Sequence, residues 1–546
     1  MPDILLIQPP IRDFYLTAKR TIPYGLACVA GALLAKGYTV AIFDALATQK
    51  SKMLDWPSEM VYLEKYYGHA DVSPFALFHR YRHFGYSFEN IGKIARESEA
   101  FLVGISSLFT AYQDEALKTA EIVKKWHPNT QVVMGGHHPT SFPQKVMASK
   151  AVDYILRGEG EDSLPLLAKA IKHGTRLNTI PGIVFRRGGG SVQVNPPAIK
   201  ADLDGSTQPA LGMIKHAFYQ RRGHGSTVVA ASRGCPLHCS YCSLGESSVI
   251  KYRRRRVASV IDEIKTAVTC HGVRFIDFED ENLSLEKGWF LHLLSGIRQR
   301  FNGKGLELRA MNGLLPASLD NEAVFAMKAA GFKTLNLSLG STSKAQLKRF
   351  NRPDIRKGFE SALKLAEIHE LGVVAYVIAG APGQRAEITL KDLLYLAPRR
   401  LLASLSIFYP APGSTDFKIC DQLGLLPDHL SLLRSSCLPV SHATNRTEAA
   451  TLLRLARILN FMKSLVDCGR SIPAPRPFAG EITLNPRNRH ETGLRLLSWF
   501  LKDGIIRGVR PDGEVYVHHG DRELIDMFLD GISHIHIRGS GIKRRA

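Results

Sequence analysis

Cysteine is scarce in this sequence, and long apolar stretches are missing from it. Its 546 residues include only eight cysteines, too few for a disulfide scaffold in a chain of this size. Because no run of roughly eighteen or more apolar residues occurs, we expect no transmembrane helix. The first residues also lack the basic region and the long apolar region of a signal peptide. These absences together predict a cytoplasmic protein with reduced cysteines.

Charge is abundant but unbalanced. Lysine and arginine number 71 against 50 aspartates and glutamates, which gives a formal net charge of +21. This excess predicts a positive surface that attracts anionic partners, whether nucleic acid, a small molecule or an acidic protein. Charge alone does not choose among them. The length and the 45% hydrophobic content suffice for two to four domains with ample cores.

Three of the cysteines are grouped in a short loop that follows an apolar run at residues 227–231. Cys235, Cys239 and Cys242 have the spacing Cys-x3-Cys-x2-Cys. Iron–sulfur clusters are normally held by Cys thiolates, four in the ordinary case. Since no fourth cysteine lies nearby, one iron would stay open to another ligand. The alternative is three incidental cysteines in a turn, and that is how we interpret the scattered ones: Cys28, Cys270, Cys420, Cys437 and Cys468.

Residues 1–175 alternate short apolar runs with amphipathic stretches. This alternation predicts a parallel sheet with helices on both faces, a doubly wound domain of the flavodoxin or Rossmann type. Ligands of such sheets bind at the carboxyl ends of the strands, near the point where the strand order reverses. We expect strands at 4–7, 38–43, 101–106, 132–134 and 154–156, and helices at 25–35, 112–126 and 164–172.

The strand–helix alternation resumes at residue 227 and predicts a partial (β/α)6 barrel, with reactive groups at the carboxyl ends of its strands. Expected barrel strands are 228–231, 275–279, 306–309, 334–337, 373–378 and 404–408. Residues 176–226 hold a hairpin signal around Arg186–Gly190 and are interpreted as a linker. Residues 416–546 contain amphipathic helices and no motif that carries chemistry. The predicted fold is therefore α/β, with a first domain at 1–175, the linker, a barrel at 227–415 and an α-rich C-terminal domain at 416–546 that caps the barrel.

The cysteine triplet, with Tyr241 before its last cysteine, resembles the radical S-adenosylmethionine (radical SAM) enzymes. In that family three cysteines bind a 4Fe–4S cluster, and the open iron chelates the amino and carboxylate groups of S-adenosylmethionine. The resemblance implies that an electron from the cluster cleaves the sulfonium and releases a 5′-deoxyadenosyl radical. The cofactor carries this hard step while the protein orients and shields it. The resemblance further implies an external electron donor of the flavodoxin or ferredoxin type.

The same resemblance assigns the ends of the barrel strands to S-adenosylmethionine. Acidic residues after the second strand would lie near the methionyl amine, although polar residues at a strand end can equally form a solvated loop. A glycine-rich turn after the fifth strand would lie against the adenine. The residues expected to bind S-adenosylmethionine are Tyr241, Glu279, Asp280, Ser338, Ser341, Gly380 and Pro382.

One position departs from the family pattern. After the fourth barrel strand the family often has a Glu near the ribose hydroxyls, and this chain has Gly340 there. The ribose contact would then come from Ser338 or Ser341, or the binding of S-adenosylmethionine is altered.

Segments of the first domain resemble the cobalamin-binding domain that precedes the barrel in one branch of the radical SAM family: ILLIQPP, Tyr24-Gly25-Leu26, GGHHPT and RGEGE, in that order. The Asp-x-His-x-x-Gly signature for a cobalt-ligating His is missing, as is usual in that branch, so no cobalt ligand is assigned. The alternative is a domain that keeps the fold and has lost the cofactor. The residues expected to contact cobalamin are Tyr24, Ser106, Ser107, Gly135, Gly136, His138, Thr140 and Glu159.

Residues 51–100 form a long aromatic-rich insert between the second and third strands. Long inserts are often lids or binding segments. Aromatic residues at this spacing nevertheless favour packing over substrate contact.

The resemblance implies a class B methyltransferase-like enzyme with three cofactors: a 4Fe–4S cluster, S-adenosylmethionine and cobalamin. Its expected reaction transfers a methyl group, via methylcobalamin, to an unactivated carbon or to phosphorus of a small-molecule or peptide substrate. The alternative with the same cofactors is a cyclase or oxidative rearrangement enzyme of the anaerobic tetrapyrrole cyclase type. Methylthiolation of tRNA is disfavoured, because those enzymes carry three further cysteines in the first domain and this chain has only Cys28 there. Nucleic acid is therefore not expected as a partner, and the intact triplet argues against a purely cobalamin-binding sensor.

Overall fold

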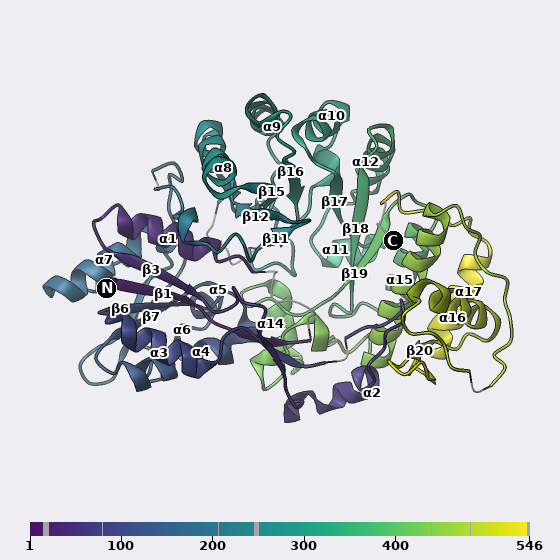
Figure 1. Cartoon of the computed structure of the whole chain (residues 1–546), viewed down its shortest axis with the longest axis horizontal. Helices are drawn as coiled ribbons and strands as arrows, with labels where there is room; N and C mark the ends of the chain where they lie inside the picture. The colour runs from purple at the N-terminus through teal and green to yellow at the C-terminus, as the bar shows by residue number, and fades with distance from the viewer. Residues whose placement is uncertain are drawn as a thin grey trace.

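The computed structural model describes residues 1–14, 21–78, 80–205, 207–244, 251–437, 439–480 and 482–542. Figure 1 shows the chain as an arc, with the first domain on the left, the barrel at the top and the C-terminal region on the right. No helix within those ranges is both long and apolar enough to cross a membrane.

The first domain is built on one sheet. Its order within the described residues is β10-β9-β8-β7-β6-β1-β3. The central strand β1 (Ile4–Gln8) pairs in parallel with β3 (Val40–Asp44) on one side and β6 (Leu102–Ser106) on the other. Strands β7 (Gln131–Gly135) and β8 (Tyr154–Leu156) continue in parallel. The strand order therefore reverses between β1 and β6, which is where ligands of doubly wound sheets bind.

Helices cover both faces of this sheet, as the alternation predicted. Helix α1 (Tyr24–Leu34) packs beside α7 (Gly160–His173), while α3 (Phe88–Ser98) packs beside α4 (Gln113–Trp126). Leu5 and Ile7 belong to one apolar core, and Ile4 and Leu6 to another. Successive side chains of a strand point to opposite faces, so both faces of β1 are buried. The doubly wound fold is confirmed.

The predicted hairpin forms, and it extends the first sheet. Strand β9 (Ile183–Arg186) pairs antiparallel with both β8 and β10 (Val192–Val194). Residues 183–194, which the sequence indicated as part of a linker, thus pack with the first domain.

The aromatic insert is largely buried. Strands β4 (Ser51–Met53) and β5 (Arg82–Phe84) join β2 (Ile11–Asp13) in a small antiparallel sheet, with η1 (Ser58–Leu63) and α2 (Glu64–Tyr67) between them. Tyr67, Phe75 and Tyr81 lie in the same apolar core as the barrel and the C-terminal region. Their burial confirms the prediction that the insert serves packing.

The barrel has the strands that the sequence predicted, with boundaries shifted by a few residues. Strands β12 (His224–Val229), β15 (Val273–Phe278) and β16 (Glu307–Ala310) are parallel neighbours, with β11 (Gln220–Arg221) antiparallel at their outer edge. Strands β17 (Thr334–Gly340), β18 (Gly372–Ala379) and β19 (Leu402–Ile407) form the second parallel set. Single bridges between Leu308 and Phe332 and between Leu314 and Leu337 join the two sets. Helices α8 (Val257–His271), α9 (Lys287–Phe301), α10 (Asn321–Ala330), α12 (Arg356–Ile368) and α13 (Ala386–Leu396) connect the strands (Figure 1).

The C-terminal region closes the outer edge of the barrel. It contains α14 (Thr415–Gln422), α15 (Arg446–Asp467), α16 (Arg489–Asp503), the strand pair β20 (Arg507–Val509) and β21 (Val515–Val517), and α17 (Arg522–Ser533). Helix α15 starts at a capping box, in which Asn445 and Glu448 satisfy each other's backbone amides. It runs along β19, where Asn460 Nδ2 donates to the Ala403 carbonyl (2.6 Å) and Asn460 Oδ1 accepts from the Ala403 amide (3.0 Å).

A buried polar cluster ties the insert to the C-terminal region. Asp71 of the insert accepts a hydrogen bond from His518 Nε2 at 2.9 Å, and Arg454 Nη1 of α15 lies 4.0 Å from the same carboxylate. Burial, reinforced by the charge of Arg454, lowers the pKa of His518 to about 4, although the hydrogen bond to Asp71 opposes this shift.

Candidate functional site

The three grouped cysteines lie in a loop, residues 234–244, that we call the triplet loop. Its base is an antiparallel pair between β13 (Ser232–Arg233) and β14 (Arg253–Arg254). Burial raises the pKa of Cys235 and Cys242, and the neighbouring thiols add to the rise. The thiols therefore lie close enough to repel one another as thiolates, a repulsion that bound iron would offset.

Two acidic residues from the end of β15 hold the triplet loop in place. Asp280 accepts hydrogen bonds from the Ala231 amide (3.1 Å) and the Ser232 hydroxyl (2.5 Å). Glu281 accepts from the Gly234 amide at 3.0 Å. Asp280 is fully buried, which raises its pKa to about 7. These contacts make Asp280 and Glu281 anchors of the loop.

Glu279 differs from Asp280, its neighbour in sequence. Its side chain is exposed, while its backbone is held by Val229 and Asn312. A carboxylate presented at the barrel mouth suits the positively charged amine predicted to bind there. Glu279 and Asp280 are adjacent in the sequence, but the first is exposed and the second is buried. Only the structure shows this difference.

Tyr241 packs within the wall of the barrel. Its hydroxyl accepts a hydrogen bond from Arg352 Nη1 at 2.6 Å, and its ring meets Phe350 edge-on at 5.1 Å. Arg352 also donates to the Ser338 carbonyl at 2.6 Å. It lies beside Gly340, since a Cβ atom at Gly340 would stand 3.6 Å from the Arg352 side chain. The position where the family often has Glu is therefore bordered by a cation, a contact that the sequence pattern does not indicate.

The other expected S-adenosylmethionine contacts are firmly packed. Ser341 is buried and donates its hydroxyl to Asp392 at 2.8 Å. Gly380 has φ +76° and no room for a side chain, because a Cβ atom would lie 2.7 Å from Pro439. Pro382 is buried in the same turn. Of the two serines proposed for the ribose, Ser338 faces the barrel interior more openly, being only partly buried.

An ion pair lies inside the barrel. Arg309 of β16 binds Asp277, its register partner on β15, with Arg309 Nε 3.0 Å from Asp277 Oδ2. Tyr376 of β18 is near enough for both charges to act on its pKa, which burial raises. In register, Tyr376 stands beside Ser338 on one side and Ser404 on the other. Ser338, Tyr376 and Ser404 therefore line one face, the interior face of the barrel.

The carboxyl edge of the first sheet carries the residues assigned to cobalamin. A small cavity of about 40 Å³ opens there, lined by Gln8, Ser106, Ser107 and Tyr112 among others. It lies at the ends of β1 and β6, which is the switch point of the sheet. This is the edge at which the sequence predicts a bound ligand.

Two polar atoms at this edge are buried without a partner: Ser107 Oγ and His138 Nε2. Burial lowers the pKa of His138 to about 4, which keeps its ring neutral. Gly136 has φ +119°, and a Cβ atom there would lie 2.5 Å from the Ser107 carbonyl oxygen. Buried polar groups are normally satisfied, so these atoms and the side-chain-free backbone fit a large polar ligand such as a corrin.

Thr140 and Gly135 support this edge. The Thr140 hydroxyl donates to the Gly136 carbonyl at 2.8 Å and accepts from the Gly158 amide at 3.0 Å. The Gly135 carbonyl accepts from the Ser107 amide at 2.8 Å.

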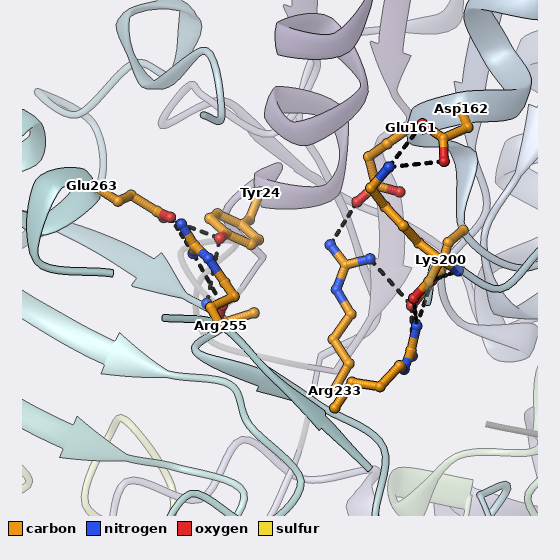
Figure 2. Close-up of polar contacts among 10 residues, drawn as sticks. Tyr24, Glu161, Asp162, Lys200, Arg233, Arg255 and Glu263 are labelled. Carbon is orange, nitrogen blue, oxygen red and sulfur yellow. Dashed lines mark hydrogen bonds and ion pairs between the residues drawn. The ribbon is translucent and has the colours of Figure 1, made fainter. Parts of the chain in front are cut away.

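Tyr24, also assigned to cobalamin, lies where the first domain meets the barrel (Figure 2). Glu159, assigned to cobalamin too, pairs there with Arg233 and Arg253. The Tyr24 hydroxyl donates to Glu263 of α8 at 3.0 Å, and Glu263 also binds Arg255. Glu159 accepts two hydrogen bonds from Arg253, each 2.9 Å long. Arg–carboxylate pairs of this forked kind are strong and directional.

Arg233 is the central residue of this contact. It binds Glu161 at 2.5 Å and Glu159 at 3.2 Å, and Figure 2 shows its side chain reaching from the barrel toward Glu161. Burial alone would lower the pKa of Arg233, but the two carboxylates outweigh burial and raise it. We call Arg233, Arg253, Glu159 and Glu161 the domain clamp. It fixes both flanks of the triplet loop to the first domain.

No three His, Cys, Asp or Glu side chains within the described ranges converge on a single metal-ion position. A 4Fe–4S cluster does not require this, because its cysteines bind different irons. The donor set, three adjacent thiols in one anchored loop, fits three corners of such a cluster.

Two family models match the chain. One, described as a B12 binding domain, covers residues 70–168, and the other, described as the Radical SAM superfamily, covers residues 229–393. A doubly wound domain followed by a partial barrel with a cysteine triplet defines a radical SAM enzyme with a B12-binding domain. The chain therefore combines a B12-binding domain with a radical SAM domain, which is the domain pair of the cobalamin-dependent radical SAM enzymes. A 4Fe–4S cluster, S-adenosylmethionine and cobalamin are the cofactors typical of these enzymes.

Relatives include methyltransferases and cyclases. Cytidylyl-2-hydroxyethylphosphonate methyltransferase of Streptomyces wedmorensis is 26% identical over 79% of this chain and 84% of its own length. The anaerobic magnesium-protoporphyrin IX monomethyl ester cyclase of Cereibacter sphaeroides is 28% identical over 61% of this chain and 55% of its own length. Among solved structures, the radical S-adenosylmethionine methyltransferase TsrM of Kitasatospora setae, with cobalamin and a [4Fe-4S] cluster bound, matches with TM-score 0.57 at 19% identity, covering 78% of this chain and 76% of that one. The radical enzyme OxsB matches with TM-score 0.60 at 15% identity, covering 99% of this chain and 76% of that one. These last two likenesses concern the fold alone.

Proposed function

We propose that this protein is a cytoplasmic methyltransferase that transfers a methyl group to an unactivated carbon or to phosphorus of a small-molecule or peptide substrate. The observation that carries the proposal is the domain clamp. It joins the carboxyl edge of the first sheet to the loop of the cysteine triplet, through Arg233 and Glu161. A corrin site and a cluster site would thereby lie in one chain. A protein that only bound cobalamin would not need the cluster site.

When bound, the cluster and S-adenosylmethionine supply a radical that removes a substrate hydrogen, and cobalamin supplies the methyl group. S-adenosylmethionine would serve both as the methyl source and as the radical source, and a flavodoxin- or ferredoxin-type donor would supply the electron. Cys235, Cys239 and Cys242 would hold the cluster. Ser107 Oγ and His138 Nε2 would donate to or accept from the polar rim of the corrin, since neither has another partner.

The relatives favour methyl transfer over the alternative. The phosphonate methyltransferase is matched over most of both chains, whereas the cyclase is matched over 55% of its length. The cyclase is nevertheless slightly more identical where it aligns, so a cyclase or oxidative rearrangement remains the second candidate function.

Product mass separates the two functions. The protein is reconstituted without oxygen with iron, sulfide and cobalamin, then incubated with a reduced flavodoxin, methyl-labelled S-adenosylmethionine and a metabolite extract of the source cells. Methyl transfer predicts a product that is heavier by one CH2 unit and carries the label. Loss of hydrogen or gain of oxygen, with no label in the product, would instead establish the cyclase-type reaction. Cys239→Ser is the control for extract chemistry that does not depend on the cluster.

A further inference from the structure

A wide cavity lies outside the cluster and corrin sites. It measures about 1470 Å³ and lies between the edge of β19, one face of α15 and the segment 485–491 that leads into α16. On α15 its lining residues recur three and four positions apart, from Leu453 to Cys468, which places them on one helical face. The opposite side of α15 packs against α13 and α17.

The cavity borders the last barrel strand, β19, along residues Leu402 to Leu405. Ser404 lines it, and Ser404 is the register partner of Tyr376, which in turn pairs with Ser338. All three side chains share the interior face. One lining residue, Ser404, therefore belongs to the strand face that carries an expected S-adenosylmethionine contact, Ser338.

The wall of the cavity is strongly basic. Its described lining holds four arginines and one carboxylate: Arg457, Arg470, Arg487, Arg489 and Glu491. The carboxylate is engaged elsewhere, because Glu491 pairs with Arg495 at 3.2 Å.

Two of the arginines are oriented by partners other than carboxylates. Arg470 Nη1 donates a hydrogen bond to His490 Nε2 at 2.7 Å. Arg489 donates to the Ser73 carbonyl of the insert at 3.2 Å. Such contacts direct the guanidinium groups without neutralising their charge. Helix α16 also begins at the cavity, with Asn488 as its cap, and its positive end adds to the same potential.

We propose that this arginine-lined cavity binds an anionic oxygen group of the methyl acceptor: a phosphate, phosphonate or carboxylate. Guanidinium forks match the geometry of all three groups. The inference rests on the proposed function, and it names the substrate class for the same barrel. A reacting atom over the interior face would then be positioned by an anionic group held near the outer edge of β19.

The test measures anion binding and needs no turnover. The reconstituted protein is titrated by calorimetry at low ionic strength with inorganic phosphate, methylphosphonate and succinate. We expect at least one of them to bind, and its affinity to fall about ten-fold or more in the Arg470→Gln/Arg487→Gln double variant. Which probe binds most tightly distinguishes phosphate, phosphonate and carboxylate.

The matched control is Arg298→Gln/Arg300→Gln on α9, which removes the same charge from an exposed helix face. This control should bind the anion like the unsubstituted protein. If both double variants lose the same affinity for the anion, the effect is one of net charge and the proposal is wrong. The proposal is also wrong if none of the three anions binds detectably to the unsubstituted protein. Cleavage of S-adenosylmethionine in the absence of acceptor should be unchanged in the cavity variant. Failure of methyl transfer alone would refute the proposed function but leave the anion site standing.

Discussion

Arg233 and Glu161 join the barrel to the first domain through a hydrogen bond of 2.5 Å, two residues before Cys235. The Arg233 side chain is 27% exposed and the Glu161 side chain 8%. The position of the triplet loop therefore depends on a carboxylate that belongs to the first domain.

Glu161→Gln tests this dependence. Removing one partner of a buried pair leaves the other charge uncompensated, but Arg233 keeps Glu159, so we expect a loss of about 1–2 kcal/mol in unfolding free energy. Iron should also be lost faster from the reconstituted protein. Urea denaturation and iron release to a chelator measure the two effects. Glu121→Gln, which breaks an exposed pair with Lys118, is the matched control and should cost less than about 0.5 kcal/mol.

Cys239→Ser should abolish the cluster. We expect iron to fall from about four per chain to near zero after anaerobic reconstitution, with loss of the visible absorbance of the cluster. Cys270→Ser, at an exposed thiol of α8, should keep the full iron content. Retention of about four irons in the Cys239 variant would contradict the assignment of the triplet.

Gly136→Ala should weaken cobalamin binding. The new methyl group would face the Ser107 carbonyl oxygen at 2.5 Å, and the φ of +119° disfavours any residue except glycine. Gly303→Ala is the control, because Gly303 also has positive φ but an added Cβ meets nothing within 4 Å. Both variants should lose about 1 kcal/mol of stability from the backbone alone. Only the Gly136 variant should retain less cobalamin after gel filtration, and equal retention would argue against a corrin at this edge.

Mild acid should destabilise the contact between the insert and the C-terminal region. The pKa of His518 is about 4 in the folded protein against 6.5 in an unfolded chain. Between these pH values the unfolded chain binds a proton that the folded one does not, so stability falls as pH falls from 6.5 to 4. The full loss is about 3 kcal/mol. Urea midpoints across this range measure it, and His518→Gln should flatten the slope. An unchanged slope in that variant would assign the acid sensitivity to other groups.

Much of the fold follows from local sequence patterns. The strands of both domains were predictable, because buried parallel strands are short apolar runs between amphipathic helices. The triplet was equally clear, since its spacing is local. The hairpin at residues 183–194 was recognised, but not its pairing with β8, because antiparallel addition to a sheet edge leaves no mark in the hairpin itself.

The side-chain contacts that hold the site together were harder to predict from the sequence. Arg233 and Glu161 are 72 residues apart, and no periodicity connects them. Asp280 and Glu279 are adjacent acids with opposite exposure, which depends on how the end of β15 turns. Arg352 reaches Gly340 only after the chain has passed through α11 (Lys344–Arg349) and returned. The sequence Asn351-Arg352-Pro353 is a turn signal that could have indicated this return of the chain. In the structure Asn351 has a left-handed backbone, with φ +48°. The sequence alone does not specify which side chains pair when they are distant in the chain and close in the fold.

The paired hydrogen bonds between Asn460 and Ala403 have a consequence for the open side of the barrel. A last strand with a bare edge is a template for another strand, either from a second copy or from an unfolded chain. The Asn460 side chain bonds both the amide and the carbonyl of Ala403. It therefore takes the hydrogen bonds that an added strand would otherwise make with this residue. The barrel can thus stay incomplete without exposing this point to aggregation, and the gap beside β19 is left free for a small ligand.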